Sequence, residues 1–419
     1  MFKRKFLLYI LSSLIFVLVV RAAPPAAITD LKPTLILISL DGYRYDYIDI
    51  YHPQNLSRLA EQGVRAKWMT PIFPSKTFPN HYTIATGLYA EHHGIIGNKM
   101  YDPQFKAFFT LGDRAEVQKP RWWLGEPIWV TAQKHGLKTA AYFYPGTEAE
   151  IDGMRPTFWM AYNDSTPNSK RVDQTLAWLD LPVEQRPQFY ALYFSDLDDA
   201  GHDYSPDSPE IAQAVAHVDS AIGGLLDGLQ SRGIDKQVNL IIVSDHGMAT
   251  VQPGNVVLLD NYFDRDQADV IIWDHQVTGI FPKDGKTNSI YNALITRLPG
   301  HITCYKKADI PDRYHFKHNR RIAPIICVAE EGWMMMECSR YEEAVKENKI
   351  PDHPTGAHGY DNRLQSMQAI FVAYGPAFKQ HSVIEPFVNV DVYNIMTKIL
   401  DLTPAKNDGG VDTAAEVLK

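Results

Sequence analysis

The chain has 419 residues, of which 45% are hydrophobic and 21% are charged, and its formal net charge is −8. This composition excludes a disordered or fibrous chain and is typical of a globular protein. An acidic protein is a poor non-specific partner for nucleic acid, because phosphate backbones are bound by basic surfaces. Three cysteines are too few for a disulfide scaffold, and the sequence leaves open which two of Cys304, Cys327 and Cys338 could form a bridge.

The first 22 residues have the parts of a secretory signal peptide. Basic residues at positions 3–5 precede an apolar run from Phe6 to Val20, and Val20 and Ala22 fit a cleavage site. The run is short for a membrane-spanning helix, so cleavage is expected rather than an uncleaved anchor. No other long apolar run follows in residues 23–419. We therefore predict a periplasmic or secreted protein whose mature chain has no membrane span.

Three continuous apolar segments, at residues 34–40, 188–194 and 238–243, predict strands that are buried on both faces of a parallel sheet. Acidic residues and histidines follow each segment: Asp41; Asp196, Asp198, Asp199 and His202; Asp245 and His246. Open α/β sheets place their ligands at the carboxyl ends of such strands. Helices predicted between the strands, at about 46–63, 172–181 and 208–233, indicate a mostly parallel α/β sheet covered by helices on both faces.

A hydroxyl group lies at the predicted start of a short helix between the first two of these strands. Residues 74–82 read Pro-Ser-Lys-Thr-Phe-Pro-Asn-His-Tyr, and the helix is expected to begin at Thr77 and to end near Gly87. Pro79 is tolerated in a first turn, and the free N–H groups of that turn suit an anion such as phosphate. Taken alone, Thr77 is better explained as a helix N-cap. The acidic and histidine residues elsewhere in the chain favour a metal-activated nucleophile.

The remainder of the chain is less regular. Residues 251–340 contain short strand-like segments, at 292–295 and 323–328, and we interpret about 251–350 as a small α+β insert without chemistry of its own. His358 then lies between Gly356 and Gly359. A further helix is expected from 126, strands at 139–144 and 369–374, and a last helix at 390–400. Residues 23–419 are therefore predicted to form one catalytic domain.

Six side chains form a candidate metal-binding set without cysteine thiolate. Asp198 and His202 are four residues apart, so one helical turn would present both on the same face. The complete set is Asp41, Asp198, His202, Asp245, His246 and His358. For any single histidine a structural role is the better explanation. Oxygen and nitrogen ligands at strand ends suit catalytic Zn²⁺, and six ligands with one hydroxyl suit two metal ions and in-line phosphoryl displacement.

Several motifs closely resemble the nucleotide pyrophosphatase/phosphodiesterase family of the alkaline phosphatase superfamily. They are Asp41-Gly42, residues 74–82, Thr86 to Tyr89, His93 to Ile96, Ser244 to Met248 and Ser366 to Ala369. The resemblance covers the mature chain and implies an alkaline-phosphatase-like fold in a bacterial-type, stand-alone catalytic domain. It also implies that one zinc ion is held by Asp41, Asp245 and His246 and contacts Thr77, and that a second is held by Asp198, His202 and His358. The family usually has a single aspartate at the 198 position, so Asp196 or Asp199 could share this role.

The resemblance further implies roles for four residues near the scissile bond. Thr77 would be the nucleophile and form a covalent phosphothreonine. Asn98 and the backbone N–H of Phe78 would donate to a phosphoryl oxygen, while Phe78 and Tyr162 would hold a nucleobase. Without the resemblance, Asn98 is a turn residue and the aromatic residues are packing residues.

The predicted activity is that of a two-zinc phosphodiesterase/pyrophosphatase, which releases nucleoside 5′-monophosphates from a small-molecule nucleotide or phosphodiester substrate. The nearest alternative is the same chemistry on lipid or choline head-group diesters. A phosphomonoesterase would need an arginine or another metal ion for the additional charge, and a non-catalytic binding protein would be expected to lack some of the six ligands.

Overall fold

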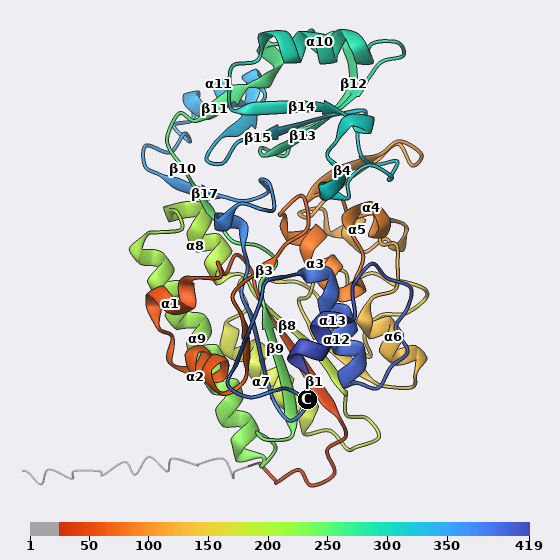
Figure 1. The fold of residues 1–419 in the computed structure, drawn as a ribbon, viewed down its shortest axis with the longest axis vertical. Helices are drawn as coiled ribbons and strands as arrows, with labels where there is room; N and C mark the ends of the chain where they lie inside the picture. Colours follow the sequence, from red (N-terminus) through yellow and green to blue (C-terminus); the bar gives the residue numbers. More distant parts are fainter. Residues whose placement is uncertain (1–24) are drawn as a thin grey trace, which may run out of the picture.

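The computed structural model describes residues 25–419, so the predicted signal peptide lies outside the described part (Figure 1). An eight-stranded sheet forms the centre, in the order β19-β2-β18-β9-β1-β8-β6-β7. Its strands are β1 (Thr34–Leu40), β2 (Val64–Ala66), β6 (Thr139–Tyr142), β7 (Phe158–Met160), β8 (Phe189–Phe194), β9 (Val238–Val243), β18 (Phe371–Tyr374) and β19 (Ser382–Ile384). The three apolar segments are adjacent as β9-β1-β8, and every residue in them is buried.

The sheet is mostly parallel, as predicted. Among its described strands, only β18 runs antiparallel to its neighbours, β9 and β2. In the parallel register Leu40 lies beside Phe194, and Ser39 lies beside Val243. The carboxyl ends of the three central strands therefore meet at one edge of the sheet, which is where ligands are bound in such folds.

Helices cover both faces of this sheet. Leu35 and Leu37 of β1 pack into one core with α3 (Thr77–Thr86), α6 (Ile128–Lys134) and α12 (Val392–Ile399). Ile36 and Ile38 point to the opposite core, formed with α2 (Gln54–Gln62), α7 (Asn168–Leu179) and α9 (Pro209–Ser231). Side chains of a strand alternate between faces, so a mostly apolar run is expected when both faces are covered. Figure 1 shows the two helical layers on either side of the strands.

The predicted helix at 46–63 is two helices, α1 (Tyr47–Tyr51) and α2. The break falls at His52, which has a φ of 49°, and at Pro53. Proline disfavours the helical conformation in the preceding residue, which explains why the chain turns here. The uninterrupted helix was therefore a wrong prediction, although its apolar face, with Leu56 and Leu59, packs on the sheet as expected.

A second lobe extends beyond the carboxyl edge of the main sheet (Figure 1). We call residues 256–346 the sub-lobe; the rest of the described chain is the main lobe. The sub-lobe contains a four-stranded antiparallel sheet in the order β12-β13-β15-β14. Its elements are β11 (Val256–Leu258), β12 (Ala268–Ile272), β13 (Val277–Pro282), α10 (Thr287–Arg297), β14 (Ile302–Lys306), β15 (Ile325–Ala329), β16 (Met334–Met336) and α11 (Cys338–Lys346).

Residues 292–295, which were expected to be strand-like, lie within α10. Ile290 and Leu294 are four residues apart and both buried, whereas Ile295 is 55% exposed. The short apolar segment thus belongs to a helical period, and a four-residue window was too short to separate the two patterns.

The structure also resolves the cysteine pairing that the sequence left open. Cys304 and Cys327 form a disulfide between the neighbouring strands β14 and β15. Cys338, at the start of α11, is a free thiol. Among residues 25–419, no helix is both long and apolar enough to cross a bilayer.

Candidate active site

The carboxyl edge of the central sheet gathers the predicted metal ligands. Asp41 follows β1, and Asp245 with His246 follows β9. Directly after β8, helix α8 (Asp196–Tyr204) carries Asp198 and His202 one turn apart. The sixth residue, His358, follows β17 (Thr355–Ala357), which pairs with β10 (Ala249–Val251).

These six residues form two groups of three. The first, which we call the buried group, consists of Asp41, Asp245 and His246, whose candidate ligand atoms lie within 4.8 Å of one another. His246 Nε2 is 3.5 Å from Asp41 Oδ1 and 2.9 Å from Asp245 Oδ2. Thr77 Oγ1 is 3.3 Å from His246 Nε2. The predicted nucleophile therefore lies directly beside this group.

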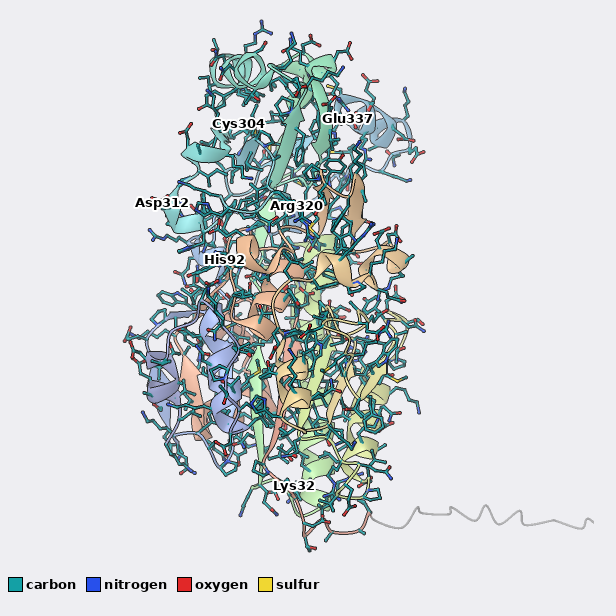
Figure 2. All side chains as sticks on the ribbon, turned by 90° about the vertical axis from the view of Figure 1, so that its right-hand side faces the viewer. Lys32, His92, Cys304, Asp312, Arg320 and Glu337 are labelled. Carbon is teal, nitrogen blue, oxygen red and sulfur yellow. A yellow bond between two sulfur atoms is a disulfide. The ribbon has the colours of Figure 1, made fainter. Side chains whose placement is uncertain are left out.

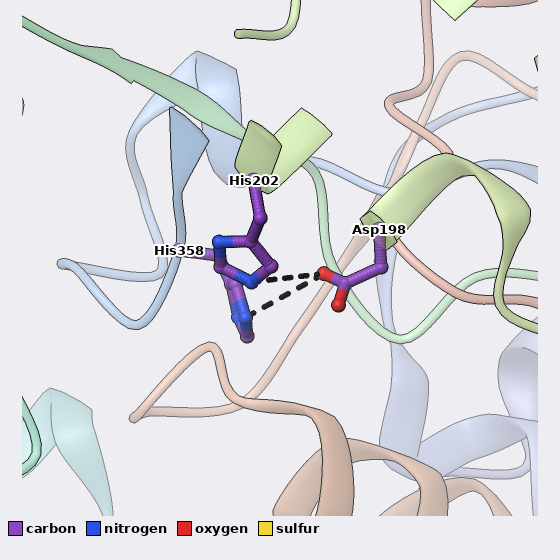
Figure 3. A group of neighbouring side chains, drawn as sticks. All are labelled: Asp198, His202 and His358. Carbon is purple, nitrogen blue, oxygen red and sulfur yellow. Dashed lines mark ion pairs between the residues drawn. The ribbon is translucent and has the colours of Figure 1, made fainter. Parts of the chain in front are cut away.

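The second group, which we call the open group, consists of Asp198, His202 and His358. Figure 3 shows Asp198 facing both imidazoles, with its Oδ1 3.4 Å from His202 Nε2 and 3.6 Å from His358 Nε2. The ring centroids of His246 and His358 are 3.6 Å apart and nearly parallel. This stacking places the two groups side by side.

All three histidines are held in the same way. Nδ1 of His246 is 2.8 Å from the carbonyl oxygen of Gly247, Nδ1 of His202 is 2.9 Å from that of Gly356, and Nδ1 of His358 is 2.9 Å from that of Ser75. Because a carbonyl only accepts, Nδ1 carries the proton and Nε2 presents a lone pair to the carboxylates. Metal-ligating histidines typically donate their other ring N–H to such a carbonyl.

Three carboxylate oxygens in these groups are buried without a hydrogen-bond partner among the described residues. They are Asp41 Oδ1, Asp198 Oδ1 and Asp245 Oδ2, one from each aspartate. A buried carboxylate without a partner is strongly unfavourable, so such atoms are normally paired or bound to a cation. The donors therefore fit metal ions, and nitrogen and oxygen ligands without thiolate suit zinc.

The electrostatics of the buried group are those of carboxylates that need a counter-charge. Burial, followed by the nearby charges of Asp245 and Asp198, raises the pKa of Asp41 well above its usual range. Burial also opposes ionisation of Asp245, but His246 and His81 lower the pKa of this carboxyl overall. For His246, burial lowers the pKa and the carboxylate of Asp245 more than compensates, so the pKa is raised.

The position of the aspartate on α8 was left open by the sequence, and the structure brings Asp198 into the open group. Asp196 instead accepts hydrogen bonds from Asn168 Nδ2, at 2.8 and 3.0 Å, and lies 2.5 Å from His217 Nδ1. Asp199 lines the adjoining cavity. Burial, and then the charge of Asp198, raises the pKa of Asp199.

Thr77 is the first residue of α3, and Lys76 occupies the N-cap position in an extended conformation. Thr77 is therefore not the N-cap residue that the alternative interpretation required. Its hydroxyl is directed to His246 of the buried group. The backbone N–H of Phe78 donates to Asn98 Oδ1 at 2.9 Å. This differs from the expected pair of donors, because the Phe78 N–H is taken by Asn98. The contact orients the amide of Asn98 and leaves its Nδ2 as the available donor.

A cavity of about 260 Å³ adjoins both groups. Thr77, Asp41 and Asp198 line this cavity, and so do the charged side chains of Arg114, Glu148 and Asp199. The remaining lining residues include Phe78, Leu111, Val117, Phe143, Tyr144, Tyr162 and Tyr193. Phe78 packs against Phe109 and Trp123, whereas Tyr162 is 37% exposed and packs edge-on against Phe143 and Tyr193. Both aromatic residues that were predicted to hold a base therefore line this cavity.

Two functional neighbours were missed by the sequence interpretation. Tyr193 donates its hydroxyl hydrogen to Asp41 Oδ2 at 2.6 Å. His81 Nδ1 lies 2.9 Å from the carbonyl oxygen of Thr77 and 3.3 Å from Asp245 Oδ2. His81 follows Thr77 by four residues, so its place on the same helix face was available from the sequence. No local pattern distinguishes Tyr193 from other residues of a buried strand.

Comparison with known proteins agrees with this geometry. Fold and site together combine a mostly parallel α/β sheet with two candidate metal-binding groups beside a hydroxyl group. Residues 35–361 match the family model described as type I phosphodiesterase/nucleotide pyrophosphatase, so the chain belongs to this family and the predicted resemblance is confirmed. It is 40% identical over 395 residues to a venom phosphodiesterase of Crotalus durissus collilineatus, covering 92% of this chain and 46% of the relative.

Two further relatives support the assignment. Ectonucleotide pyrophosphatase/phosphodiesterase family member 1 of Mus musculus is 39% identical over 398 residues, which cover 93% of this chain and 43% of that protein. An inactive threonine-to-alanine variant of murine ENPP5 in complex with AMP superimposes with a TM-score of 0.84 at 35% identity, covering 92% of this chain and 99% of that one. The predicted fold class is thereby confirmed. The chain spans about half the length of the curated relatives it matches.

Proposed function

We propose that this chain is a two-zinc nucleotide phosphodiesterase/pyrophosphatase that releases nucleoside 5′-monophosphates. One observation carries the proposal. Two groups of candidate ligands lie beside the hydroxyl of Thr77, and each contains at least one histidine Nε2 and at least one carboxylate oxygen without a hydrogen-bond partner in the described chain. One zinc ion would be held by Asp41, Asp245 and His246 and the other by Asp198, His202 and His358.

The residues of the chain divide the reaction between them. Bound zinc ions would supply positive charge that favours the alkoxide of Thr77 and the negative charge of the displaced group. Thr77 Oγ1 attacks phosphorus, which forms an Oγ–P bond and breaks the bond to the leaving alcohol or phosphate. Water then cleaves the phosphothreonine ester, which restores the hydroxyl and releases the monophosphate. Asn98 Nδ2 donates to a non-bridging oxygen as charge develops there.

The cavity favours a nucleotide over a lipid or choline head group. Phe78 and Tyr162 line the same cavity of about 260 Å³ as Thr77, together with other aromatic rings. Aromatic side chains offer flat apolar faces on which a base can stack. The murine ENPP5 complex contains AMP, the product class proposed here. We also infer that residues 23–419 act as one catalytic unit after export, in keeping with relatives named as venom enzymes.

The experiment compares p-nitrophenyl thymidine 5′-monophosphate, p-nitrophenyl phosphate and p-nitrophenyl phosphorylcholine as substrates, with and without added zinc. We expect a zinc-dependent preference for the nucleotide ester, its loss in Thr77→Ala, and partial retention in Thr77→Ser. A preference for the choline ester would move the substrate to head-group diesters. Activity that survives Thr77→Ala would contradict the covalent mechanism. N-terminal sequencing of the exported protein, expected to begin at residue 23, tests the signal peptide separately.

A further inference from the structure

Arg321 belongs to the sub-lobe, yet its guanidinium lies inside the main lobe. It is 1% exposed, in the segment that connects β14 to β15. Nε donates to Asp102 Oδ2 at 2.8 Å, Nη1 donates to the carbonyl oxygens of Gly94 at 2.6 Å and Trp122 at 2.7 Å, and Nη2 donates to that of Arg121 at 3.0 Å. Four of the five N–H groups of this side chain are therefore used.

These contacts hold both ends of the segment that carries the phosphoryl-oxygen donor. Gly94 precedes Asn98 by four residues, and Asp102, the last residue of β4 (Lys99–Asp102), follows it by four. Between the two ends, the backbone carbonyl of Asn98 accepts from the N–H of Leu111 at 3.0 Å, and its side chain accepts from Phe78. The position of Asn98 relative to Thr77 thus depends on where segment 94–102 is held.

Asp102 and Gly94, at the two ends of this segment, both fit closely around the guanidinium of Arg321. Asp102 is fully buried and also pairs with Arg320, which Figure 2 shows below Cys304 of the sub-lobe and above His92 of the main lobe. A Cβ at Gly94 would lie 2.7 Å from Arg321 Nη1, and the φ of Gly94 is +81°. Glycine is therefore required here by both the backbone conformation and the approach of the arginine.

The same guanidinium also holds residues that pack behind the cavity lining. Trp122 and Arg121, whose carbonyl oxygens accept from Arg321, immediately precede Trp123. The ring of Trp123 packs 6.0 Å from that of Phe78 and 4.9 Å from that of Tyr82, both on α3. One sub-lobe side chain thus connects the Asn98 segment with the aromatic wall behind Phe78.

We propose that Arg321 is a positioning residue for the reaction: it fixes segment 94–102 so that Asn98 is aligned with the phosphoryl group at Thr77. This inference rests on the proposed function. It gives the sub-lobe, expected to have no chemistry of its own, a part in catalysis without contact with substrate. A fork of fixed N–H directions is needed to reach three carbonyl groups and a carboxylate at once, and lysine cannot replace it.

The first test uses Arg321→Lys, with Arg232→Lys as the matched control. Arg232 is also buried and bonds a carboxylate and a carbonyl, those of Asp180 and Gly228, at the far end of α9. We expect Arg321→Lys to lower kcat for the nucleotide ester about 10- to 100-fold, since small misplacements of catalytic groups have effects of this size, with KM changed less than about threefold. The control is expected to leave both within about twofold.

A double-mutant cycle with Asn98→Ala separates positioning from a general loss of structure. If Arg321 acts through Asn98, Arg321→Lys changes kcat less than about threefold when Asn98 is already alanine. Equal factors in the two backgrounds would overturn the proposal.

Asp102→Asn is the second variant, because it keeps the oxygen that accepts from the N–H groups of Gln104 and Phe105 and removes the partner of Arg321.

Amide hydrogen exchange in the metal-free protein gives a readout that does not depend on turnover. Arg321→Lys is expected to speed exchange at Phe78 and across 94–102 at least tenfold, while Arg232→Lys leaves it unchanged. Unchanged exchange in a folded Arg321→Lys protein would contradict the proposal whatever the activity. An inactive wild-type protein, or an Asn98→Ala variant with normal kcat, would instead count against the proposed function, and the two failures are therefore distinguishable.

Discussion

Two buried polar clusters lie close together in this molecule, and they differ in how complete they are. Around Arg321, nearly every donor and acceptor is paired within the protein, including both oxygens of Asp102. Around Thr77, three carboxylate oxygens in the described chain have no partner. Asp102 and Arg321 in the first cluster and Asp41 and Asp245 in the second are all buried. Folding alone therefore satisfies the polar groups of the first cluster, whereas the unpaired oxygens of the second need a cation as their partner.

The largest expected effect separates Asp198 from its neighbour Asp196. Asp198→Asn removes a charged ligand from the open group, so kcat/KM for the nucleotide ester should fall at least about 10³-fold, equivalent to about 4 kcal/mol. Asp196→Asn changes a carboxylate that is already paired with Asn168, and kcat/KM should stay within about threefold. Steady-state kinetics decide the matter, and equal losses would contradict the assignment of Asp198.

The disulfide is expected to affect stability without affecting chemistry. Cys304 and Cys327 are separated by 23 residues, and they close the loop that carries Arg321. Replacing both by serine should lower the free energy of unfolding by about 3 kcal/mol through the gained entropy of the unfolded chain. Because the contacts of Arg321 are retained, kcat should stay within about threefold. Urea unfolding and kinetics on the same preparation check both statements, and a large loss of kcat would show that the contacts of Arg321 depend on the disulfide.

Zinc is expected to stabilise the incomplete cluster and to leave the complete one unchanged. At a zinc concentration about 100 times the dissociation constant, each site should add about 2.7 kcal/mol to the free energy of unfolding. Asp41→Asn should reduce this gain and should also make the metal-free protein more stable, because it removes a buried carboxylate whose Oδ1 has no partner in the described chain. Thermal unfolding with and without zinc measures both. A Tm of the wild-type protein that does not change with zinc would argue against zinc binding by the buried and open groups.

The last effect concerns the pH dependence of stability at His93, which lies next to Gly94 and belongs to the complete cluster. Its Nε2 bonds to Thr83, its Nδ1 accepts from the N–H of Ile95, and burial lowers its pKa to about 3. The unfolded chain protonates this residue near pH 6.5, whereas the folded protein does not. Stability should therefore decrease as the pH falls from about 6.5 towards 3, by at most about 1.4 kcal/mol per pH unit.

A matched variant isolates this contribution. His93→Gln keeps polar atoms at the site but does not titrate, so the free energy of unfolding should fall less steeply between pH 6.5 and pH 5 than in the wild-type protein. Identical slopes in the two proteins would show that His93 is not held in its neutral form.

The sequence predicted those parts of the fold that local pattern determines. β1 and β9 have the predicted bounds because strands buried on both faces are mostly apolar along their whole length. The neighbourhood of five candidate ligands, Asp41, Asp198, His202, Asp245 and His246, was predictable because strand ends and helix spacing place them without knowledge of the rest. The contacts of Arg321 were not predictable, because nothing near it in the chain indicates that its side chain reaches Gly94 and Asp102. Likewise, the bond between Phe78 and Asn98 follows from tertiary packing rather than from either motif.

The stacking of His246 on His358 has a consequence for protons. The two ring centroids are 3.6 Å apart, and a charge on one imidazole opposes a charge on the other. Burial, and then any positive charge on His246, lowers the pKa of His358 well below its usual range. His358 is therefore held as a neutral imidazole, the form in which histidine binds a metal ion.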